Sequence, residues 1–100
     1  MPEASVQTTP VQSPAPATVR KPYPTFKVIV LNDDFNTFEH VAKCLLKYIP
    51  AMTESLAWSL TDQVHYEGSA IVWIGPQEQA ELYHSQLSLE GLTMAPLEEA

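Results

Sequence analysis

The hydrophobic and polar positions of residues 25–98 predict six elements of secondary structure. Residues 25–31, TFKVIVL, form an apolar run rich in β-branched side chains, and the polar residues that follow mark it as a strand. Residues 70–74, AIVWI, predict a second strand, and its nearly continuous apolar character indicates that both of its faces are at least partly covered. Residues 92–97, LTMAPL, predict a short last strand. Because Pro96 has no amide hydrogen to donate, this strand is expected to lie at a sheet edge or to leave the ladder there.

Three amphipathic helices are expected between these strands. The first begins near Asn36, which stands three residues before Glu39 in a variant of the capping-box pattern, and it ends at Pro50. Thr53 is the expected N-cap of the second helix, and Pro76 suits the first position of the third. Apolar side chains recur at spacings of three and four and define the three predicted buried faces: Val41, Cys44, Leu45, Tyr48 and Ile49; Leu56, Ala57, Leu60 and Val64; Ala80, Tyr83 and Leu87.

The order β-α-α-β-α-β predicts an α/β (α+β) two-layer sandwich, in which three helices pack on one face of a small three-stranded sheet. Residues 1–24 carry 6 of the 9 prolines and only scattered apolar side chains. Such a segment cannot bury enough apolar surface to offset its ordering entropy, so it is expected to be a disordered N-terminal arm before a domain at residues 25–98. The arm is either a solvated tail or a tether that engages a partner.

Charge and composition narrow the class of partner. The formal net charge is −7, and from residue 28 onward 11 acidic residues stand against 2 basic ones. Such a surface repels phosphate, so neither nucleic acid nor a membrane is an expected partner, whereas basic ligands are favoured. The single cysteine, Cys44, cannot form an intramolecular disulfide, and the sequence shows no signal segment and no membrane-length apolar stretch. A cytoplasmic protein is expected.

Little in the sequence indicates catalysis, and no cofactor or metal is expected. Cys44 falls within the apolar stripe of the first helix, where a lone cysteine is more often a small core residue than a nucleophile. The three histidines lie on three different predicted helices and share no ligand spacing such as HxxxH. A small metal- or cation-dependent enzyme that uses Asp33, Asp34 and His65 remains the alternative, although the acidic stretch lacks the glycine of a calcium loop.

The stretch NDD, residues 32–34, is the strongest candidate for a binding site. Its simplest interpretation is a polar turn whose acids complement the N-terminus of the following helix. Phe35 and Phe38 argue for more, because a plain turn would carry solvated residues at these places. His65 shares a helix face with Thr61 that is expected to lie beside the buried stripe, and such a histidine is more often a surface residue than a ligand.

Three runs of the sequence together resemble one known family. VLNDDFNTFEHVAKCL, LTDQVHYEGSAIVWIG and QEQAELYHSQL are similar to the ClpS family, adaptors that hand substrates with destabilising N-terminal residues to a Clp AAA+ protease. The resemblance covers residues 25–98, and the segment WIGPQEQAELYHSQL is similar to the sequences of cyanobacterial members. It implies a compact α/β domain behind a flexible arm, N-degron peptides as ligands, and a Clp unfoldase of the ClpC or ClpA type as partner.

The resemblance also assigns roles to residues. It implies that Asn32, Asp33 and His65 surround the α-ammonium group of a substrate's first residue, with Asp34 as a secondary contributor at the helix end. The side chain of that first residue would enter an apolar pocket. The matching pocket positions are Asn36, Phe38, Val41, Thr61, Val64 and Thr93.

Some positions depart from the commoner pattern of the family. Phe38 and Thr61 stand where methionine is frequent, so Phe38 is expected to narrow the pocket mouth and Thr61 to enlarge or polarise its floor. On the surface that docks to the unfoldase, Glu78 matches an acidic position of the family, whereas Tyr83 replaces a usual lysine. The resemblance therefore carries over only Glu78 for docking.

Overall fold

The computed structural model describes residues 24–100, so the predicted disordered arm lies almost entirely outside the described residues and stays a prediction. The described part is a mixed α/β domain with three helices and a small antiparallel sheet, as the sequence predicts. In chain order the elements are β2 (Thr25–Leu31), α1 (Phe38–Tyr48), α2 (Glu54–Glu67), β3 (Ser69–Pro76), α3 (Gln77–Leu89), β4 (Thr93–Met94) and β5 (Glu98–Glu99).

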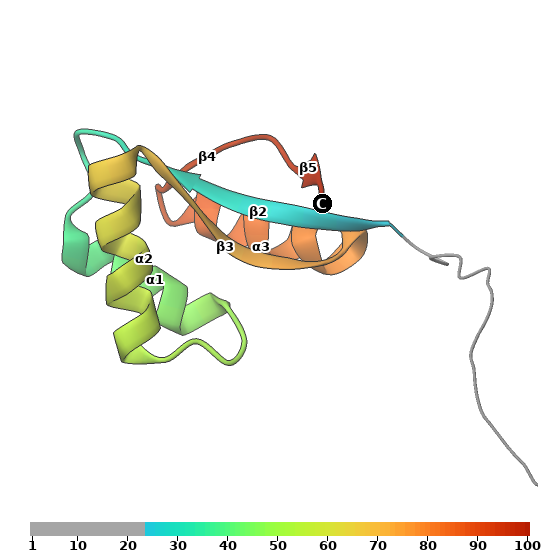
Figure 1. The fold of residues 1–100 in the computed structure, drawn as a ribbon, viewed down its shortest axis with the longest axis horizontal. Coiled ribbons are helices and arrows are strands. Elements are labelled where there is room, and N and C mark those ends of the chain that lie inside the picture. Colours follow the sequence, from blue (N-terminus) through green and yellow to red (C-terminus); the bar gives the residue numbers. More distant parts are fainter. Residues whose placement is uncertain (1–23) are drawn as a thin grey trace, which may run out of the picture.

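The central strand of the sheet is β2. Strand β3 pairs with one of its edges along its full length, while β4 and β5 follow one another along the other edge (Figure 1). The predicted single last strand is therefore two short strands. Ala95 still donates its amide hydrogen to the carbonyl of Ile29 at 3.1 Å, Pro96 then interrupts the ladder, and Ala100 donates to Thr25 at 2.8 Å.

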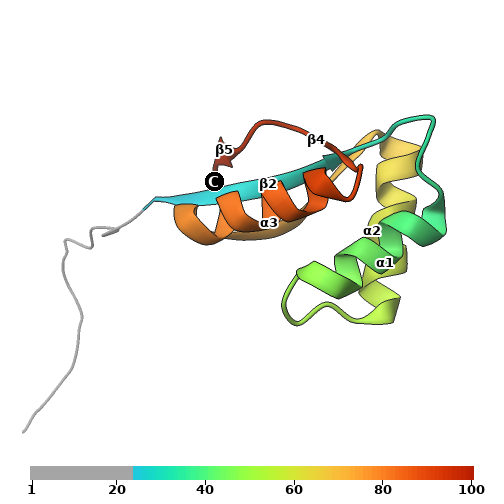
Figure 2. The same cartoon turned by 180° about the vertical axis from the view of Figure 1, so that it is seen from behind.

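The helices cover one face and one end of the sheet. Helix α3 runs along the back of β2 and β3, and α1 and α2 pack together beyond the end of the sheet at which β2 stops (Figures 1 and 2). Trp73 of β3 packs edge-on against Tyr83 of α3, with ring centroids 4.9 Å apart. The largest fully buried side chains come from three elements that meet in the core, namely Val28 and Val30 of β2, Leu45 of α1 and Leu87 of α3.

Two helix starts test the expected caps. Thr53 caps α2 as predicted, because its hydroxyl accepts the amide hydrogen of Leu56 at 3.1 Å. The cap of α1 is Thr37 rather than Asn36, since the Thr37 hydroxyl accepts the amide hydrogen of His40 at 3.1 Å. Asn36 is used elsewhere, which makes it part of the candidate site.

Two expected burial patterns are wrong, and a third holds only in part. Strand β3 is well covered on the face toward α3, whereas Ile71 and Ile74 on its other face are 43% and 53% exposed. Leu56 of α2 is also exposed, and its place in the buried face is taken by Thr61, which is only 2% exposed. Thr61 tolerates this burial because its hydroxyl donates to the carbonyl of Ala57 at 2.7 Å.

The length and composition of the helices show whether any of them could cross a membrane. Within residues 24–100, none of the helices combines the length and the apolar character that a bilayer crossing requires.

Candidate functional site

A main-chain hydrogen bond brings the NDD stretch to the end of α2. Asn32 donates its amide hydrogen to the carbonyl of Gly68 at 2.9 Å, one step beyond the pairing of Leu31 with Ser69. Gly68 has a φ of 95°, a left-handed conformation that glycine adopts without steric cost, and it ends α2 three residues after His65. The register of β2 and β3 thus places two segments of distant sequence at one corner of the molecule.

The carboxylate of Asp33 is saturated with hydrogen bonds. Its Oδ1 accepts the amide hydrogens of Phe35 at 2.9 Å and Asn36 at 2.8 Å. Its Oδ2 accepts from the Asn36 side-chain amide and from the Thr93 hydroxyl, both at 2.7 Å. Because an ionised carboxylate offers about four acceptor positions, all of them are filled by the protein.

These hydrogen bonds hold the Asp33 side chain in its charged form. The largest effect on its pKa comes from the main-chain amide of Asn36, and the Thr93 hydroxyl follows. Together they hold the pKa well below its ordinary value, although burial acts in the opposite direction. The corner therefore carries a fixed negative charge at neutral pH, and that charge is rigidly placed.

Asn36 connects this turn to the loop before β4. Besides its bond to Asp33, its side-chain amide donates to the carbonyl of Gly91 at 2.9 Å. Gly91 has a φ of 94°, so the chain reverses there without strain between α3 and β4. The two loops are thereby closed over the end of the central strand, and Asn36 is diverted from the capping role that its position in the sequence suggests.

A small cavity of about 20 Å³ lies beneath these loops. Of the pocket residues expected from the sequence, Asn36, Val41, Val64 and Thr93 line it. Phe38 and Thr61 are not part of its lining, and the Thr61 hydroxyl donates to the Ala57 carbonyl within its own helix. The remaining lining residues are Val30, Leu31, Asn32, Asp33 and Leu92.

Three of these lining residues, Val30, Leu31 and Leu92, are not expected from the sequence as part of the site. Val30 and Leu31 are the last residues of an ordinary buried strand, and nothing in their pattern distinguishes them from the core. Leu92 had a usable signal, because an apolar residue directly after Gly91 must turn back into the domain.

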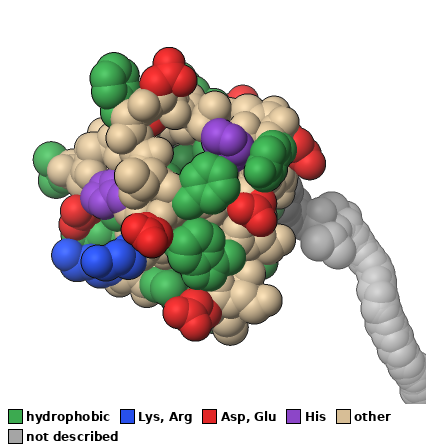
Figure 3. Space-filling view, turned by 90° about the vertical axis from the view of Figure 1, so that its left-hand side faces the viewer, with side chains coloured by type: hydrophobic (Ala, Val, Ile, Leu, Met, Phe, Trp, Pro, Cys, Tyr) green, Lys and Arg blue, Asp and Glu red, His purple; other side chains and the backbone are tan. Residues whose placement is uncertain are grey.

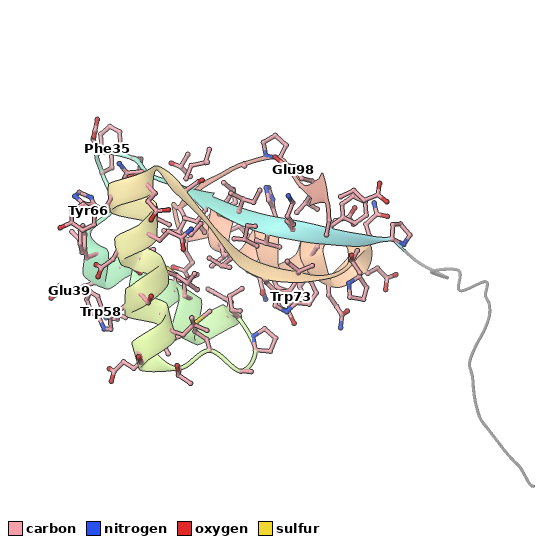
Figure 4. The ribbon with its side chains drawn as sticks, viewed as in Figure 1. Phe35, Glu39, Trp58, Tyr66, Trp73 and Glu98 are labelled. Atoms are coloured by element: carbon pink, nitrogen blue, oxygen red, sulfur yellow. The ribbon has the colours of Figure 1, made fainter. Side chains whose placement is uncertain are left out.

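Aromatic rings pack together where α1 begins and α2 ends. The ring of Phe38 packs edge-on against His65, with centroids 4.5 Å apart, and Tyr66 lies 4.7 Å from His65. Tyr66 is 77% exposed and Phe35 is 92% exposed. In Figure 4 both point outward at the same end of the molecule, and Figure 3 shows hydrophobic side chains beside a histidine on that face. Exposed apolar area of this kind is typical of a binding surface.

Asp34 and Glu78 lie apart from the cavity. Asp34 neighbours Asp33 in sequence but is exposed and does not line the cavity, so the two acids are not equivalent. Glu78 is exposed in the first turn of α3, beside Pro76, which pairs with Thr25 at the opposite end of β2 from Asn32. A surface around Glu78 is therefore spatially separate from the corner.

The metal-dependent alternative is not supported. All four acceptor positions of Asp33 are occupied by protein donors, which leaves none for a cation. Across residues 24–100, the side chains that stand within metal-ligand distance of one another are a different group, His40, Cys44 and Glu90.

Comparison with known proteins identifies the family. The model of the family described as "ATP-dependent Clp protease adaptor protein ClpS" matches residues 21–97. The adapter protein ClpS of Synechocystis sp. is 76% identical over 84 residues, which are 84% of this chain and 86% of that protein. The adapter protein ClpS of Nostoc sp. is 77% identical over 83 residues, covering 83% and 86% of the two chains.

A solved structure agrees in fold. Agrobacterium tumefaciens ClpS2 bound to L-phenylalaninamide superposes with a TM-score of 0.68 at 26% identity, over 77% of this chain and 98% of that one. The relatives are named as adapters of a protease rather than as catalysts, which confirms the prediction of a non-enzymatic adaptor. The chain belongs to the ClpS family of adaptor proteins of the ATP-dependent Clp protease.

Proposed function

We propose that this adaptor captures the free N-terminus of a protein marked for degradation at the corner formed by Asn32, Asp33 and His65. The observation that carries the proposal is the rigidly held, ionised Asp33 carboxylate beside the exposed Asn32 and a small cavity. His65 lies on α2 three residues before Gly68, whose carbonyl accepts the amide hydrogen of Asn32. An α-amino group has a pKa of about 7.7–8.0 and is mostly charged at neutral pH, so it is drawn to a fixed anion. Acetylation removes that charge.

The three residues have different tasks in this proposal. Asp33 has no free acceptor position, so it acts through its charge rather than through a new hydrogen bond to the ligand. Asn32 and His65 are exposed, and they supply the direct contacts. The carbonyl oxygen of the Asn32 side chain and a neutral imidazole nitrogen of His65 both accept from an ammonium group. The exposed carboxylate of Asp34 adds to the local field.

The side chain of the first residue would enter at the small cavity. Its present volume of about 20 Å³ is room for little more than one water molecule. A bulky apolar side chain therefore has to displace part of the lining. The Agrobacterium relative bound to L-phenylalaninamide supports a bulky first residue, since that ligand has a free amine and a blocked carboxyl group.

Delivery would use surfaces away from this corner. We propose that a Clp unfoldase of the ClpC or ClpA type binds the exposed region around Glu78, and that the adaptor works with it in the cytoplasm. Glu78 lines an open hollow of about 530 Å³ with Pro24, Pro76 and Gln77, next to the place where residues 1–23 join the domain. In this proposal the N-terminal arm is the tether that presents the substrate.

Peptide binding tests the recognition step. A fluorescent peptide with a free N-terminal Phe is titrated with the full chain beside the same peptide acetylated, with anisotropy as the measurement. Loss of one charge-assisted interaction of about 1.5–3 kcal/mol predicts an affinity about 10- to 100-fold lower for the acetylated peptide. Equal affinity for the two peptides would remove the basis of the proposal. A peptide with Gly placed before Phe keeps the ammonium but misplaces the ring, and it separates the two contributions.

Deletion of residues 1–22 tests delivery. We expect the shortened chain to bind the Phe peptide as before, because no residue of the corner is removed. Degradation of a Phe-initiated substrate by a Clp protease should be lost. Retained degradation would show that the segment is a tail and not a tether.

A further inference from the structure

A second cluster of polar side chains lies where α1 packs against the end of α3. His40 and Cys44 stand one turn apart on α1, and Glu90 follows directly after α3. The Nε2 atom of His40 is 3.6 Å from the sulfur of Cys44 and 2.8 Å from the main-chain oxygen of Glu90. The imidazole nitrogen, the sulfur and the Glu90 carboxylate all lie within 4.8 Å of one another. The peptide corner uses none of these three side chains.

We propose that His40, Cys44 and Glu90 form a binding site for a thiophilic divalent metal such as Zn²⁺. Tetrahedral Zn²⁺ with bonds of about 2.3 Å to sulfur and about 2.0–2.1 Å to nitrogen holds these two atoms about 3.6 Å apart. The observed separation of 3.6 Å between Cys44 and His40 already equals this value. The metal would take the position on Nε2 that the main-chain oxygen of Glu90 now occupies at 2.8 Å, so this hydrogen bond has to open when the metal binds. The carboxylate of Glu90, at the end of a flexible side chain, needs to approach by at most about 1.5 Å to complete three ligands.

The surroundings of the carboxylate support a ligand role. Lys47 donates to Oε2 of Glu90 at 3.2 Å, and the Tyr48 hydroxyl donates to the same oxygen. These bonds orient the carboxylate and leave its other oxygen, Oε1, available, which is the arrangement of an outer-shell partner around a metal ligand. A surface hollow of about 360 Å³ lined by His40, Lys43, Cys44, Lys47 and Glu90 gives a metal and its remaining water access.

The charge around the cluster selects the kind of metal. Lys43 and Lys47 line the same hollow, and Figure 3 shows basic side chains gathered beside a histidine on this face. Ca²⁺ and Mg²⁺ depend on several oxygen ligands and negative charge, so two lysines disfavour them. A metal that bonds strongly to sulfur and imidazole is affected less. Binding releases one proton, from the Cys44 thiol. His40 moves its proton from Nε2 to Nδ1 and gives up its hydrogen bond to the main-chain oxygen of Glu90.

A metal at this place would fix the loop that carries part of the peptide corner. Glu90 precedes Gly91, whose carbonyl accepts from Asn36, and Thr93 two residues later donates to Asp33. Joining Glu90 to α1 through a metal would restrict the motion of Gly91 and Thr93. The metal would thus act as a structural clamp beside the peptide corner and not as a part of it.

Titration of the full, untagged chain with Co²⁺ tests the proposal. Co²⁺ occupies tetrahedral zinc sites, shows visible d–d bands there, and gives a near-ultraviolet charge-transfer band when a thiolate is bound. Because Cys44 is the single cysteine of the chain, a thiolate band in the unaltered protein already assigns the metal to it. We expect one Co²⁺ per chain, both sets of bands, and their loss when Zn²⁺ is added.

Variants separate this site from other metal contacts. Cys44→Ser should abolish the charge-transfer band. His40→Gln should weaken Co²⁺ binding by at least about 10-fold, because loss of an outer-shell partner already costs about that much and His40 is a direct ligand. His84→Gln is the matched control, since His84 is another half-buried ring bonded to a main-chain oxygen, that of Ala95, at 2.9 Å. Absence of a thiolate band at saturating Co²⁺, one metal shared by two chains, or equal losses in His40→Gln and His84→Gln would each overturn the proposal.

Discussion

Two polar clusters adjoin α1, one in the loop before its first residue and one along the side that faces Glu90, and they use their carboxylates differently. Before the helix, each carboxylate oxygen of Asp33 accepts two hydrogen bonds from the protein. Beside the last turn of the helix, one carboxylate oxygen of Glu90 accepts hydrogen bonds from Lys47 and from the Tyr48 hydroxyl. The first cluster is complete without a ligand, whereas the second retains a carboxylate oxygen and the sulfur of Cys44.

The Asp33 cluster can therefore act on a ligand only through its electric field, whereas the Glu90 cluster has atoms that can bind a metal directly. The pKa of Asp33 is lowered by hydrogen bonds, chiefly from the Asn36 amide, so its charge persists although it has no position left to bind with. The pKa of Glu90 is also lowered, chiefly by the Tyr48 hydroxyl, while burial raises the pKa of the Cys44 thiol. A neutral thiol next to a charged carboxylate is a pair that a metal can convert into two anionic ligands.

Replacing Asp33 should have the largest effect. Asp33→Ala removes four hydrogen bonds and the fixed charge, so we expect peptide affinity to fall about 100-fold or more and the free energy of unfolding to fall by about 2–4 kcal/mol. Anisotropy and urea unfolding measure the two effects. The matched control is Asp34→Ala, an exposed acid one residue away, which should change stability by no more than about 0.5 kcal/mol and affinity only a few-fold. Equal losses in both variants would mean that total negative charge matters and not its placement.

The sequence predicts the helices and strands well because they follow from local patterns. The stripe of Val41, Cys44 and Leu45 has helical spacing, and all three side chains are buried. Thr53 precedes an apolar periodic segment and caps it. The error at Asn36 has a physical cause, since two adjacent residues could each cap α1 and the choice was made by Asp33 and by Gly91, which lies 55 residues away.

The two clusters differ in how much of each can be predicted from the sequence. The NDD stretch attracts attention by its composition, but saturation of Asp33 depends on Thr93, 60 residues later. The metal-ligand group is missed because a search for paired histidines passes over a histidine and a cysteine at positions i and i+4. Glu90 joins them only through the packing of α3 on α1, which no local pattern predicts.

Acid should destabilise the protein through Asp33. The folded-state pKa of this group lies below its ordinary value of 3.8, so the folded chain holds the proton less tightly than the unfolded chain. The contribution of Asp33 to stability is therefore fully present well above pH 3.8 and is lost as the pH falls below that value toward the folded-state pKa. Urea unfolding between pH 6 and pH 2.5 should show this loss. In Asp33→Asn the decline should be smaller, and an unchanged decline would assign it to other acids.

Replacing Thr93 should have a smaller effect. Thr93→Val removes the hydroxyl that donates to Oδ2 of Asp33 and nearly preserves the shape of the side chain. We expect a loss of about 1 kcal/mol in stability and a change of no more than about fivefold in peptide affinity, because the charge of Asp33 remains. The Asp33 carboxyl, followed by NMR against pH, should show a raised pKa. A loss of binding as large as that of Asp33→Ala would show that the hydroxyl, and not the charge, carries recognition.

Replacing Tyr48 should have the smallest effect on peptide binding. Tyr48→Phe deletes the hydrogen bond that contributes most to the lowered pKa of Glu90, so NMR should show that pKa rising toward its ordinary range. The Asp33 cluster shares no hydrogen bond with Tyr48, and affinity for the Phe peptide should stay within about twofold. Co²⁺ affinity should fall about 10-fold, as expected when an outer-shell partner is lost. If peptide affinity falls with it, the two clusters are coupled, and residues 90–93, which contribute to both, are one connection between them.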